Sequence, residues 1–329
     1  MKSKFLFFFI LTLITLIGCS PKENSDLNVS SNLDKTVQSF YTGENIIESS
    51  NLHTPFMVMI ENSTSSRPQS GLGSADIIYE TSAEGGIPRF MAIFHKDMPD
   101  KIGPVRSVRP YFLDLALENN LPFAHCGGSS DALISISQDT SIMSINEISS
   151  GEYFWRDAER QSPHNLYTSS ENILNSISDN GFLSAPKKFA NFNKDYYSNQ
   201  SLSSVSNIFL NLNKNYDTSY IYEDNVYKKS MDGIAAIDAS TNEQLAFSNV
   251  VIQKTTISLQ DDNLHLDIDL TSEGEGYIFS NGRYVNAIWK KESKDDKTTF
   301  YDINGDIVPL SPGKTIWHIL SNDIDISFN

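Results

Sequence analysis

The sequence contains only two cysteines, Cys19 and Cys126, among 329 residues. Two cysteines are too few for a disulfide framework or for a cysteine-based zinc site. Other metal-site motifs are missing as well, since the chain has no H-E-x-x-H, no H-x-H and no EF-hand loop. We therefore expect no metal centre, and no motif in the sequence indicates a cofactor.

Basic residues are also scarce, because 25 lysines and arginines stand against 41 acidic residues and give a formal net charge of −16. Nucleic-acid binding depends on clustered lysine and arginine, so this balance argues against a nucleic-acid partner. Anionic surfaces should repel such a chain at long range. Any anion that it binds must be held in a local pocket.

No apolar run is long enough to span a membrane as a helix. The longest, "FLFFFILTLITLI", covers residues 5–17, follows Lys2 and Lys4, and leads into "LIGC". This arrangement is typical of a signal peptide, and its end resembles the lipobox of bacterial lipoproteins. The resemblance implies acylation of Cys19 after cleavage behind Gly18. The alternative is an ordinary secretory peptide followed by a chance cysteine.

Lipidation would anchor the chain in the membrane, since two or more acyl chains hold a protein stably. We therefore expect a lipid-anchored protein on the outer face of the bacterial cytoplasmic membrane. Cys126 would then have no intramolecular partner, and its apolar surroundings "LPFAHC" favour a buried thiol.

The composition changes several times along the chain and suggests five segments. A polar stretch rich in Ser, Asn, Asp and Glu follows the signal, and a second polar stretch separates two regions with different patterns. The expected organisation is a signal peptide (1–18), a flexible tether (19–50), an α/β domain (51–190), a linker (191–207) and an antiparallel β domain (208–329).

The first region alternates strands with helices, which indicates an α/β or α+β domain. Strands are predicted at 56–60, 77–79 and 89–94. A helix is predicted from "SVRPYFLDLALENN", with Ser107 as its cap, and a second from "GGSSDALISIS", with Ser129 or Ser130 as its cap. The second region alternates polar and apolar residues in "LHLDIDL" and carries two Asn-Gly turns, which predicts a mainly antiparallel β domain.

Several stretches together resemble the YerB family of lipoproteins. In the first region these are "MIENSTSSRPQSGLGSADIIYETSAEGGIPRFMAIF", "KIGPVRSVRPYFLDLA", "HCGGSSDAL" and "PHNLYTS". The second region contributes "NGRYVNAIWKK" and "TTFYDINGDIVPLSPGKTIWHI". The resemblance implies a two-part exported lipoprotein. It carries over no activity, because this family is a domain of unknown function.

Arginines cluster in the first region of this acidic chain. In "KIGPVRSVRP" two of them precede the predicted helix, where the helix dipole disfavours positive charge unless an anion lies between them. That anion could be internal, from Glu80 and Glu84, or it could be a bound carboxylate or phosphate. The candidate anion-binding residues are Arg67, Arg89, Arg106, Arg109, Ser129, Arg156 and Arg160.

Two histidines stand near these arginines. His125 precedes a Gly-Gly turn and a helix start, an arrangement that can hold an anion. His164 lies in "WRDAERQSPHNLY", a loop with several charged residues. Each histidine could act as a general acid or base or could be structural. The candidate acid and base residues are Glu80, Glu84, His125 and His164.

Three functions fit these observations. The preferred one is a surface lipoprotein whose first domain binds an anionic envelope component or a partner protein, which leaves catalysis undecided but disfavoured. The second is an envelope hydrolase that uses His125 or His164 with Glu80 or Glu84. The third is a structural interaction protein that docks through exposed aromatic residues of its β domain, namely Tyr220, Tyr222, Tyr277, Tyr284 and Trp289. The sequence does not determine the oligomeric state.

Overall fold

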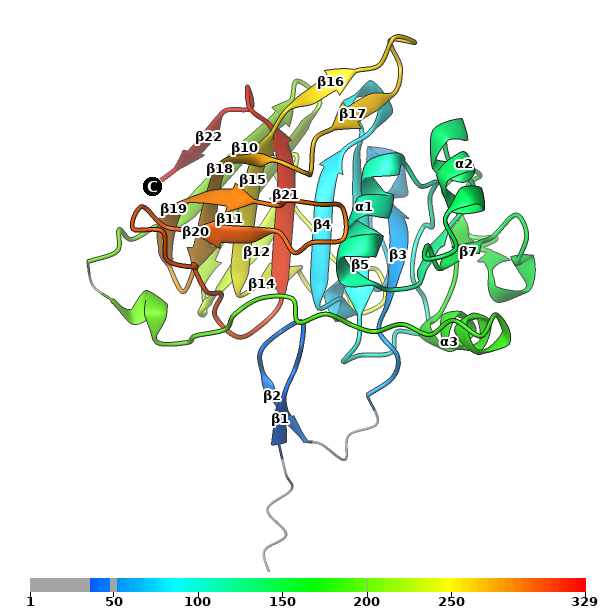
Figure 1. The fold of residues 1–329 in the computed structure, drawn as a ribbon, viewed down its shortest axis with the longest axis horizontal. Coiled ribbons are helices and arrows are strands. Elements are labelled where there is room, and N and C mark those ends of the chain that lie inside the picture. Colours follow the sequence, from blue (N-terminus) through cyan, green and yellow to red (C-terminus); the bar gives the residue numbers. More distant parts are fainter. Residues whose placement is uncertain (1–35, 48–51, 200) are drawn as a thin grey trace, which may run out of the picture. The chain divides into compact units, whose positions relative to one another are not determined.

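A ten-stranded mixed sheet contains strands from both halves of the chain (Figure 1). The computed structural model describes residues 36–47, 52–199 and 201–329, and these lie in one compact unit. The strand order is β20-β19-β18-β15-β21-β4-β5-β3-β6-β7. The strands are β3 Phe56–Glu61, β4 Ile77–Ser82, β5 Pro88–Phe94, β6 Phe123–His125, β7 Ser144–Asn146, β15 Asn249–Thr255, β18 Glu273–Ser280, β19 Arg283–Lys290, β20 Thr299–Tyr301 and β21 Thr315–Ser321.

A second sheet comes from the C-terminal half and runs in the order β13-β12-β11-β10-β22, with β14 paired to β12. Its strands are β10 Asn207–Asn213, β11 Tyr216–Glu223, β12 Val226–Met231, β13 Ile234–Ala235, β14 Ala246–Phe247 and β22 Ile326–Phe328. Three small antiparallel pairs complete the strands, namely β1 Thr36–Gln38 with β2 Asn45–Ile47, β8 Trp155–Arg156 with β9 Leu166–Tyr167, and β16 Ile257–Leu259 with β17 Leu266–Ile268.

Helices belong mainly to the N-terminal half. The α-helices are α1 Pro110–Asn119, α2 Ser130–Gln138 and α3 Ser170–Asp179, and short 3₁₀ turns are η1 Thr64–Ser66, η2 Leu72–Ser74, η3 Glu84–Gly86, η4 Gly151–Tyr153 and η5 Tyr196–Ser198. Within the described ranges, no helix has the length and apolar character needed to cross a membrane. The fold classes predicted for the two halves are confirmed.

The helix starts are set by local sequence, with one departure from expectation. The Ser129 hydroxyl accepts a hydrogen bond from the Ala132 N–H and caps α2, as predicted. Ser107 does not cap α1, because that helix begins two residues later than such a cap requires. Arg109 occupies the cap position and makes no side-chain cap hydrogen bond, while Pro110 supplies the first turn.

The central strands β3, β4 and β5 of the large sheet are buried on both faces, because the smaller sheet packs against one face and α1 against the other. All six residues of β3 are buried, as is typical of a sheet covered on both sides. Phe56 and Val58 point into a cluster shared with Tyr220 of the small sheet. Met57 points the other way, into a cluster that contains Phe112 of α1. Figure 1 shows α1 in front of the sheet.

The two halves of the chain are joined by parallel strand pairing. β21 pairs in parallel with β15 on one side and with β4 on the other. The expected linker at 191–207 therefore does not separate two independent bodies. Tyr197 within it is 1% exposed and donates a hydrogen bond to the Pro309 carbonyl at 2.8 Å. The shared sheet forms because segments distant in sequence pair with each other. Such pairing cannot be predicted from the local sequence pattern.

The hairpin β1–β2 packs against the rest of the compact unit. Tyr41 at its tip is fully buried, and its ring lies 5.5 Å from the ring of His95. The Thr42 carbonyl accepts a hydrogen bond from Gly313 N–H at 2.7 Å. The expected tether at 19–50 thus ends earlier than predicted. The predicted signal peptide and Cys19 lie outside the described residues.

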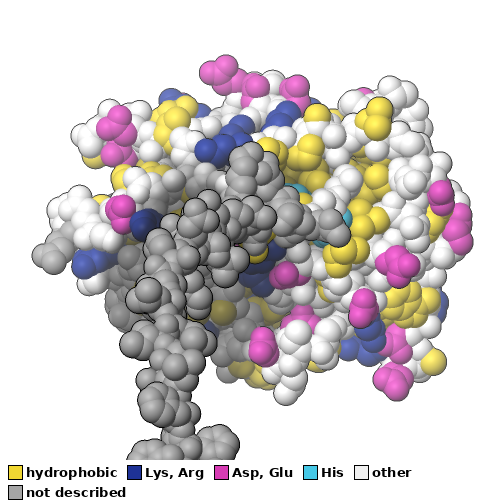
Figure 2. Space-filling view, turned by 90° about the horizontal axis from the view of Figure 1, so that it is seen from below, with side chains coloured by type: hydrophobic (Ala, Val, Ile, Leu, Met, Phe, Trp, Pro, Cys, Tyr) yellow, Lys and Arg dark blue, Asp and Glu magenta, His cyan; other side chains and the backbone are white. Residues whose placement is uncertain are grey.

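Charge is dispersed on the face seen from below. Figure 2 shows acidic and basic side chains in small separate groups over the visible part of this face. No continuous basic surface is visible in this view.

We predict that Tyr41→Ala lowers the free energy of unfolding by roughly 3–5 kcal/mol, the usual cost of removing a fully buried aromatic ring. Phe40→Ala is the matched control, because Phe40 is 46% exposed and should cost less than about 1 kcal/mol. Denaturant unfolding monitored by tryptophan fluorescence measures both. Equal, small effects would show that the hairpin is not part of the cooperative unit.

Candidate functional site

The candidate residues gather at one edge of the large sheet. β3, β6 and β7 are parallel, and β3 and β4 both run antiparallel to β5. The carboxyl ends of β3, β4, β6 and β7 therefore share an edge. In open α/β sheets ligands bind outside the carboxyl ends of the strands. The candidate arginines lie at this edge or in the loops above it.

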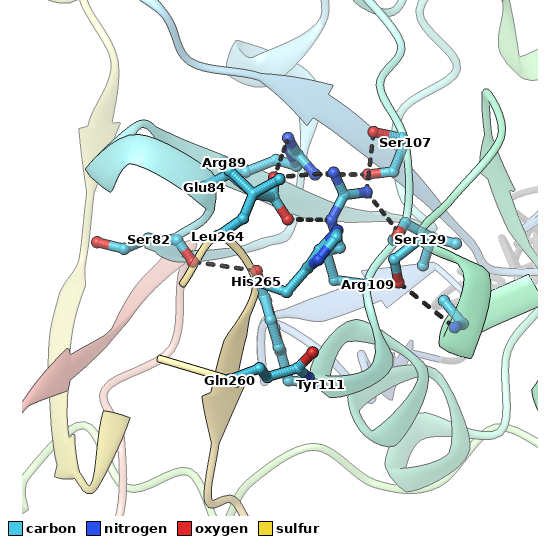
Figure 3. A network of polar contacts seen from close by, with 12 residues as sticks. Ser82, Glu84, Arg89, Ser107, Arg109, Tyr111, Ser129, Gln260, Leu264 and His265 are labelled. Atoms are coloured by element: carbon cyan, nitrogen blue, oxygen red, sulfur yellow. Dashed lines mark hydrogen bonds and ion pairs between the residues drawn. The ribbon is translucent and has the colours of Figure 1, made fainter. Parts of the chain in front are cut away.

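Arg109 meets an internal anion (Figure 3). Its guanidinium forms a two-pronged contact with the Glu84 carboxylate, through Nε to Oε1 and through Nη2 to Oε2 at 2.8 Å. Arg89 Nη2 lies 3.6 Å from the same carboxylate, and its Nη1 donates to the Ser107 carbonyl at 2.8 Å. Figure 3 also shows Leu264 and His265, from the β16–β17 connection, beside this network.

The electrostatics of this network are balanced by Glu84. Burial acts to raise the pKa of Glu84, but hydrogen bonds and charge from Arg109 outweigh it and lower that pKa. Burial, followed by the charge of Arg109, lowers the pKa of Arg89 to about 10, so Arg89 is still charged at neutral pH. The positive charges at the start of α1 are thus offset within the protein, as the structural alternative in the sequence analysis required.

A second group surrounds Glu61 at the end of β3. His164 Nδ1 lies 2.8 Å from Glu61 Oε2, and the Ser63 hydroxyl donates to Oε1 at 2.9 Å. Arg106 Nε lies 3.7 Å from Oε1. The Glu61 side chain is 6% exposed, whereas those of His164 and Arg106 are 24% and 35% exposed. The terminal nitrogens of Arg106 make no hydrogen bond to any described residue.

Further contacts, through Cys126 just after the end of β6, link Arg106 back to His164 and complete a ring of residues that includes Glu61. Cys126 donates from its backbone N–H to the Arg106 carbonyl at 3.1 Å and from Sγ to Glu147 Oε2 at 3.2 Å. Arg156 donates to Glu147 Oε1 and to Asn165 Oδ1, each at 3.4 Å. Asn165 follows His164 in the chain. We call this set the edge ring, and it consists of Glu61, Arg106, Cys126, Glu147, Arg156, His164 and Asn165.

Cys126 is a weak nucleophile in this setting. Burial and the hydrogen bond to Glu147 raise the pKa of its thiol to about 11. The thiolate is the reactive form of cysteine, and it is scarce at neutral pH when the pKa is that high. Cys126 is therefore a hydrogen-bond donor that ties Arg106 to Glu147.

The other candidates serve the structure. His125 is fully buried, and its two ring nitrogens contact the Gly127 carbonyl at 2.8 Å and the Ser144 hydroxyl at 2.7 Å. Burial lowers the pKa of His125 to about 4, so it is neutral. Arg160 donates to the backbone carbonyls of residues 66 and 68. Arg67 contacts Asp232 at 2.5 Å.

Glu80 lies in a buried network that the sequence did not indicate. Its Oε2 accepts a hydrogen bond from Lys229 Nζ at 2.7 Å, and its Oε1 accepts one from Asn62 Nδ2 at 2.8 Å. His318 Nδ1 is 3.4 Å from Oε2, and His318 Nε2 contacts the Tyr220 hydroxyl at 2.7 Å. Each of these five side chains is at most 1% exposed.

The histidine and carboxylate pairs expected from sequence are not the ones that form. Glu84 is paired with Arg109, and Glu80 with Lys229, while His164 is paired with Glu61. Sequence analysis missed Glu61, although an acidic residue at the end of an apolar strand in "FMVMIE" is a usable signal. Among the described residues, no group of three or more His, Cys, Asp and Glu side chains is placed to hold a metal ion.

The five aromatic residues considered for docking in the C-terminal half differ in their burial. Tyr220 and Trp289 are fully buried. Tyr222, Tyr277 and Tyr284 are half-buried against the core. Tyr284 borders a groove of about 720 Å³ between β19 and residues 201–203, on a different part of the molecule from the edge ring.

Comparison with known proteins places this architecture in a class. Residues 41–183 match the family described as "Protein of unknown function (DUF3048) N-terminal domain", and residues 207–317 match the corresponding C-terminal domain. These two matches cover more than half of the chain. The chain belongs to the DUF3048 family.

One relative has both a sequence and a solved structure. The protein named "Putative lipoprotein YerB" of Bacillus subtilis (strain 168) is 32% identical over 271 residues, which cover 79% of this chain and 76% of that protein. The crystal structure of YerB from Bacillus subtilis matches with a TM-score of 0.79 and 30% identity, over 88% of this chain and 99% of the YerB chain. The resemblance to the YerB family is thus confirmed.

We predict that Arg109→Ala lowers the free energy of unfolding by roughly 2–3 kcal/mol, because it leaves Glu84 with only one, more distant, cationic neighbour. Arg106→Ala, a neighbouring arginine with a looser contact, should cost less than about 1 kcal/mol. Chemical denaturation of both variants measures the difference.

The same pair has a pH dependence with a definite sign. The pKa of Glu84 is lowered in the folded state, so its stabilisation is present above the unfolded pKa and is lost as the pH falls through the folded pKa. The stability gap between wild type and Arg109→Ala should therefore narrow in acid. A gap that is unchanged or wider at low pH would contradict this account.

Proposed function

We propose that this protein is a lipoprotein, anchored through Cys19 at the outer face of the cytoplasmic membrane, that binds an anionic component of the cell envelope at the edge ring. Arg106, Arg156 and His164 are the proposed contacts. The name of its relative and the lipobox-like "LIGC" support the anchor. The partly exposed cationic residues of the edge ring support the choice of binding site.

One observation carries the choice of residues. Arg109 and Arg89 are occupied by Glu84 and Ser107, whereas the Arg106 side chain is 35% exposed and its terminal nitrogens bond to no described residue. A planar guanidinium with unused donors fits a carboxylate or phosphate. Arg156 is 48% exposed and holds its partners at 3.4 Å, so it can turn toward the same ligand. The ligand class is a carboxylate or phosphate group.

The path of the chain is compatible with this arrangement. Residues 36–47 contact His95, which follows β5, and Gly313, which precedes β21. The chain therefore enters the compact unit at the amino-terminal edge of the parallel strands, opposite the edge ring. An acidic segment of a partner protein would use the same contacts as an envelope anion.

A hydrolase is a second candidate, favoured by the Glu61–His164 pair. A carboxylate that holds Nδ1 of a histidine orients the ring and makes Nε2 available as a base. No activated nucleophile accompanies the pair, since the pKa of the Cys126 thiol is raised to about 11. Such an enzyme would have to activate water, with Arg106 holding the substrate.

We predict that a wall phosphate polymer or a muropeptide raises the melting temperature of the full chain and that Arg106→Ala and Arg156→Ala abolish the rise. A ligand at one hundred times its Kd adds about 2.7 kcal/mol to the state that binds it. Lys290→Ala is the matched control, because Lys290 is an exposed, cationic strand residue outside the ring. Differential scanning calorimetry with and without each ligand measures the shift.

Two results would redirect the proposal. A rise that persists in both arginine variants would place the site elsewhere. Release of muropeptide fragments by wild type but not by His164→Ala, detected by mass spectrometry, would replace the binding function with the hydrolase. A rise produced only by an acidic peptide would identify a protein partner in place of an envelope polymer.

A further inference from the structure

The buried network around Glu80 brings an amine and an amide onto one carboxylate. Lys229 Nζ donates to Glu80 Oε2 at 2.7 Å, and Asn62 Nδ2 donates to Glu80 Oε1 at 2.8 Å. Asn62 and Lys229 are fully buried and Glu80 is 1% exposed. The three residues come from different places, because Asn62 follows β3, Glu80 lies in β4 and Lys229 lies in β12 of the smaller sheet.

The Asn62 carbonyl is itself polarised. Its Oδ1 accepts hydrogen bonds from Arg67 Nε and from Gln69 Nε2, each at 3.0 Å. Two donors aimed at one carbonyl oxygen stabilise the negative charge that develops there when a nucleophile attacks the carbon.

Lys229 is placed to lose a proton. Burial lowers the pKa of Lys229, against the opposing effect of Glu80. Its Nζ also lies over the rings of Phe90 and Tyr220, 5.7 and 5.2 Å from their centroids. A desolvated lysine can act as a nucleophile once it is neutral, and Glu80 is in contact to accept the proton.

We propose that Lys229 and Asn62 form an intramolecular amide crosslink, with Glu80 as the proton relay and with Arg67 and Gln69 as the oxyanion donors. This inference does not depend on the proposed ligand. The crosslink would join the two sheets covalently and would close the long loop between residues 62 and 229.

The reaction balances without any outside reagent. A proton passes from the Lys229 ammonium to Glu80, and the Nζ lone pair then attacks Cγ of Asn62 to give a tetrahedral oxyanion. Protonated Glu80 gives its proton to Nδ2, and the carboxylate takes a second proton from Nζ. The Cγ–Nδ2 bond breaks with its electron pair on nitrogen. The products are the Nζ–Cγ amide, ammonia and protonated Glu80.

Peptide mass spectrometry of the full wild-type chain tests the crosslink. Trypsin does not cut before proline, so Asn62 falls in the peptide 36–89, and a modified Lys229 blocks cleavage after it. We expect peptides 36–89 and 229–254 to appear joined, with a mass equal to their sum less one ammonia. Separate peptides with cleavage after Lys229 and no ammonia loss would overturn the proposal.

Three variants assign the roles. Lys229→Arg keeps a positive charge but cannot form the amide, and Glu80→Gln cannot relay a proton, so both should lose the joined peptide. Lys228→Arg is the matched control, because Lys228 is the adjacent strand residue and its partners are on the surface, and it should keep the joined peptide. A folded Glu80→Gln variant that still gave the joined peptide would refute the proton relay. The mass of the wild-type peptides shows whether the crosslink exists, even if a variant fails to fold.

Discussion

Strand β21 pairs with β15 of its own half and with β4 of the other half, and both pairings are parallel. This double pairing makes one sheet from two segments of chain that would otherwise each expose an edge. It places His318 opposite Glu80 in the register. It also brings the smaller sheet over β4, so that Lys229 reaches Glu80. The buried network depends on this register, because a slip of one residue would turn Glu80 to the other face.

Burial determines what each charge in the N-terminal half can do. Lys229 and Glu80 have lost their water and must satisfy each other. Arg109 sits at the start of α1, where the helix dipole opposes it, and the nearby Glu84 carboxylate offsets that cost. Arg106 is only three residues away but reaches solvent, and Glu61 holds it loosely. Two arginines of one short motif therefore differ in their surroundings: Arg109 is paired with an internal carboxylate, and Arg106 is the one that we propose to meet a ligand.

Local pattern predicted the elements but not the partners. Local sequence predicted the strand at 56–60 and the helix cap at Ser129. It also predicted the change near residue 200 from mixed helices and strands to strands alone. The structure agrees with these three predictions. His164 and Glu61 are 103 residues apart, and Lys229 and Glu80 are 149 apart. Such pairs are created by the order and register of strands, which depend on contacts across the whole chain. The sequence therefore named residues that the fold brings to one edge of the sheet, but it paired His164 with the wrong carboxylates.

The chain has too few cysteines to close its long loops with disulfides, so the proposed crosslink in the network around Glu80 would serve that purpose. Many small exported proteins close long loops with disulfides. Here Cys126 is the one cysteine among the described residues, and it is occupied as a hydrogen-bond donor to Glu147. Constraining a long loop lowers the entropy of the unfolded chain whatever bond closes it. A lysine and an asparagine that meet on one carboxylate offer that constraint without sulfur, at the place where the two sheets have to stay together.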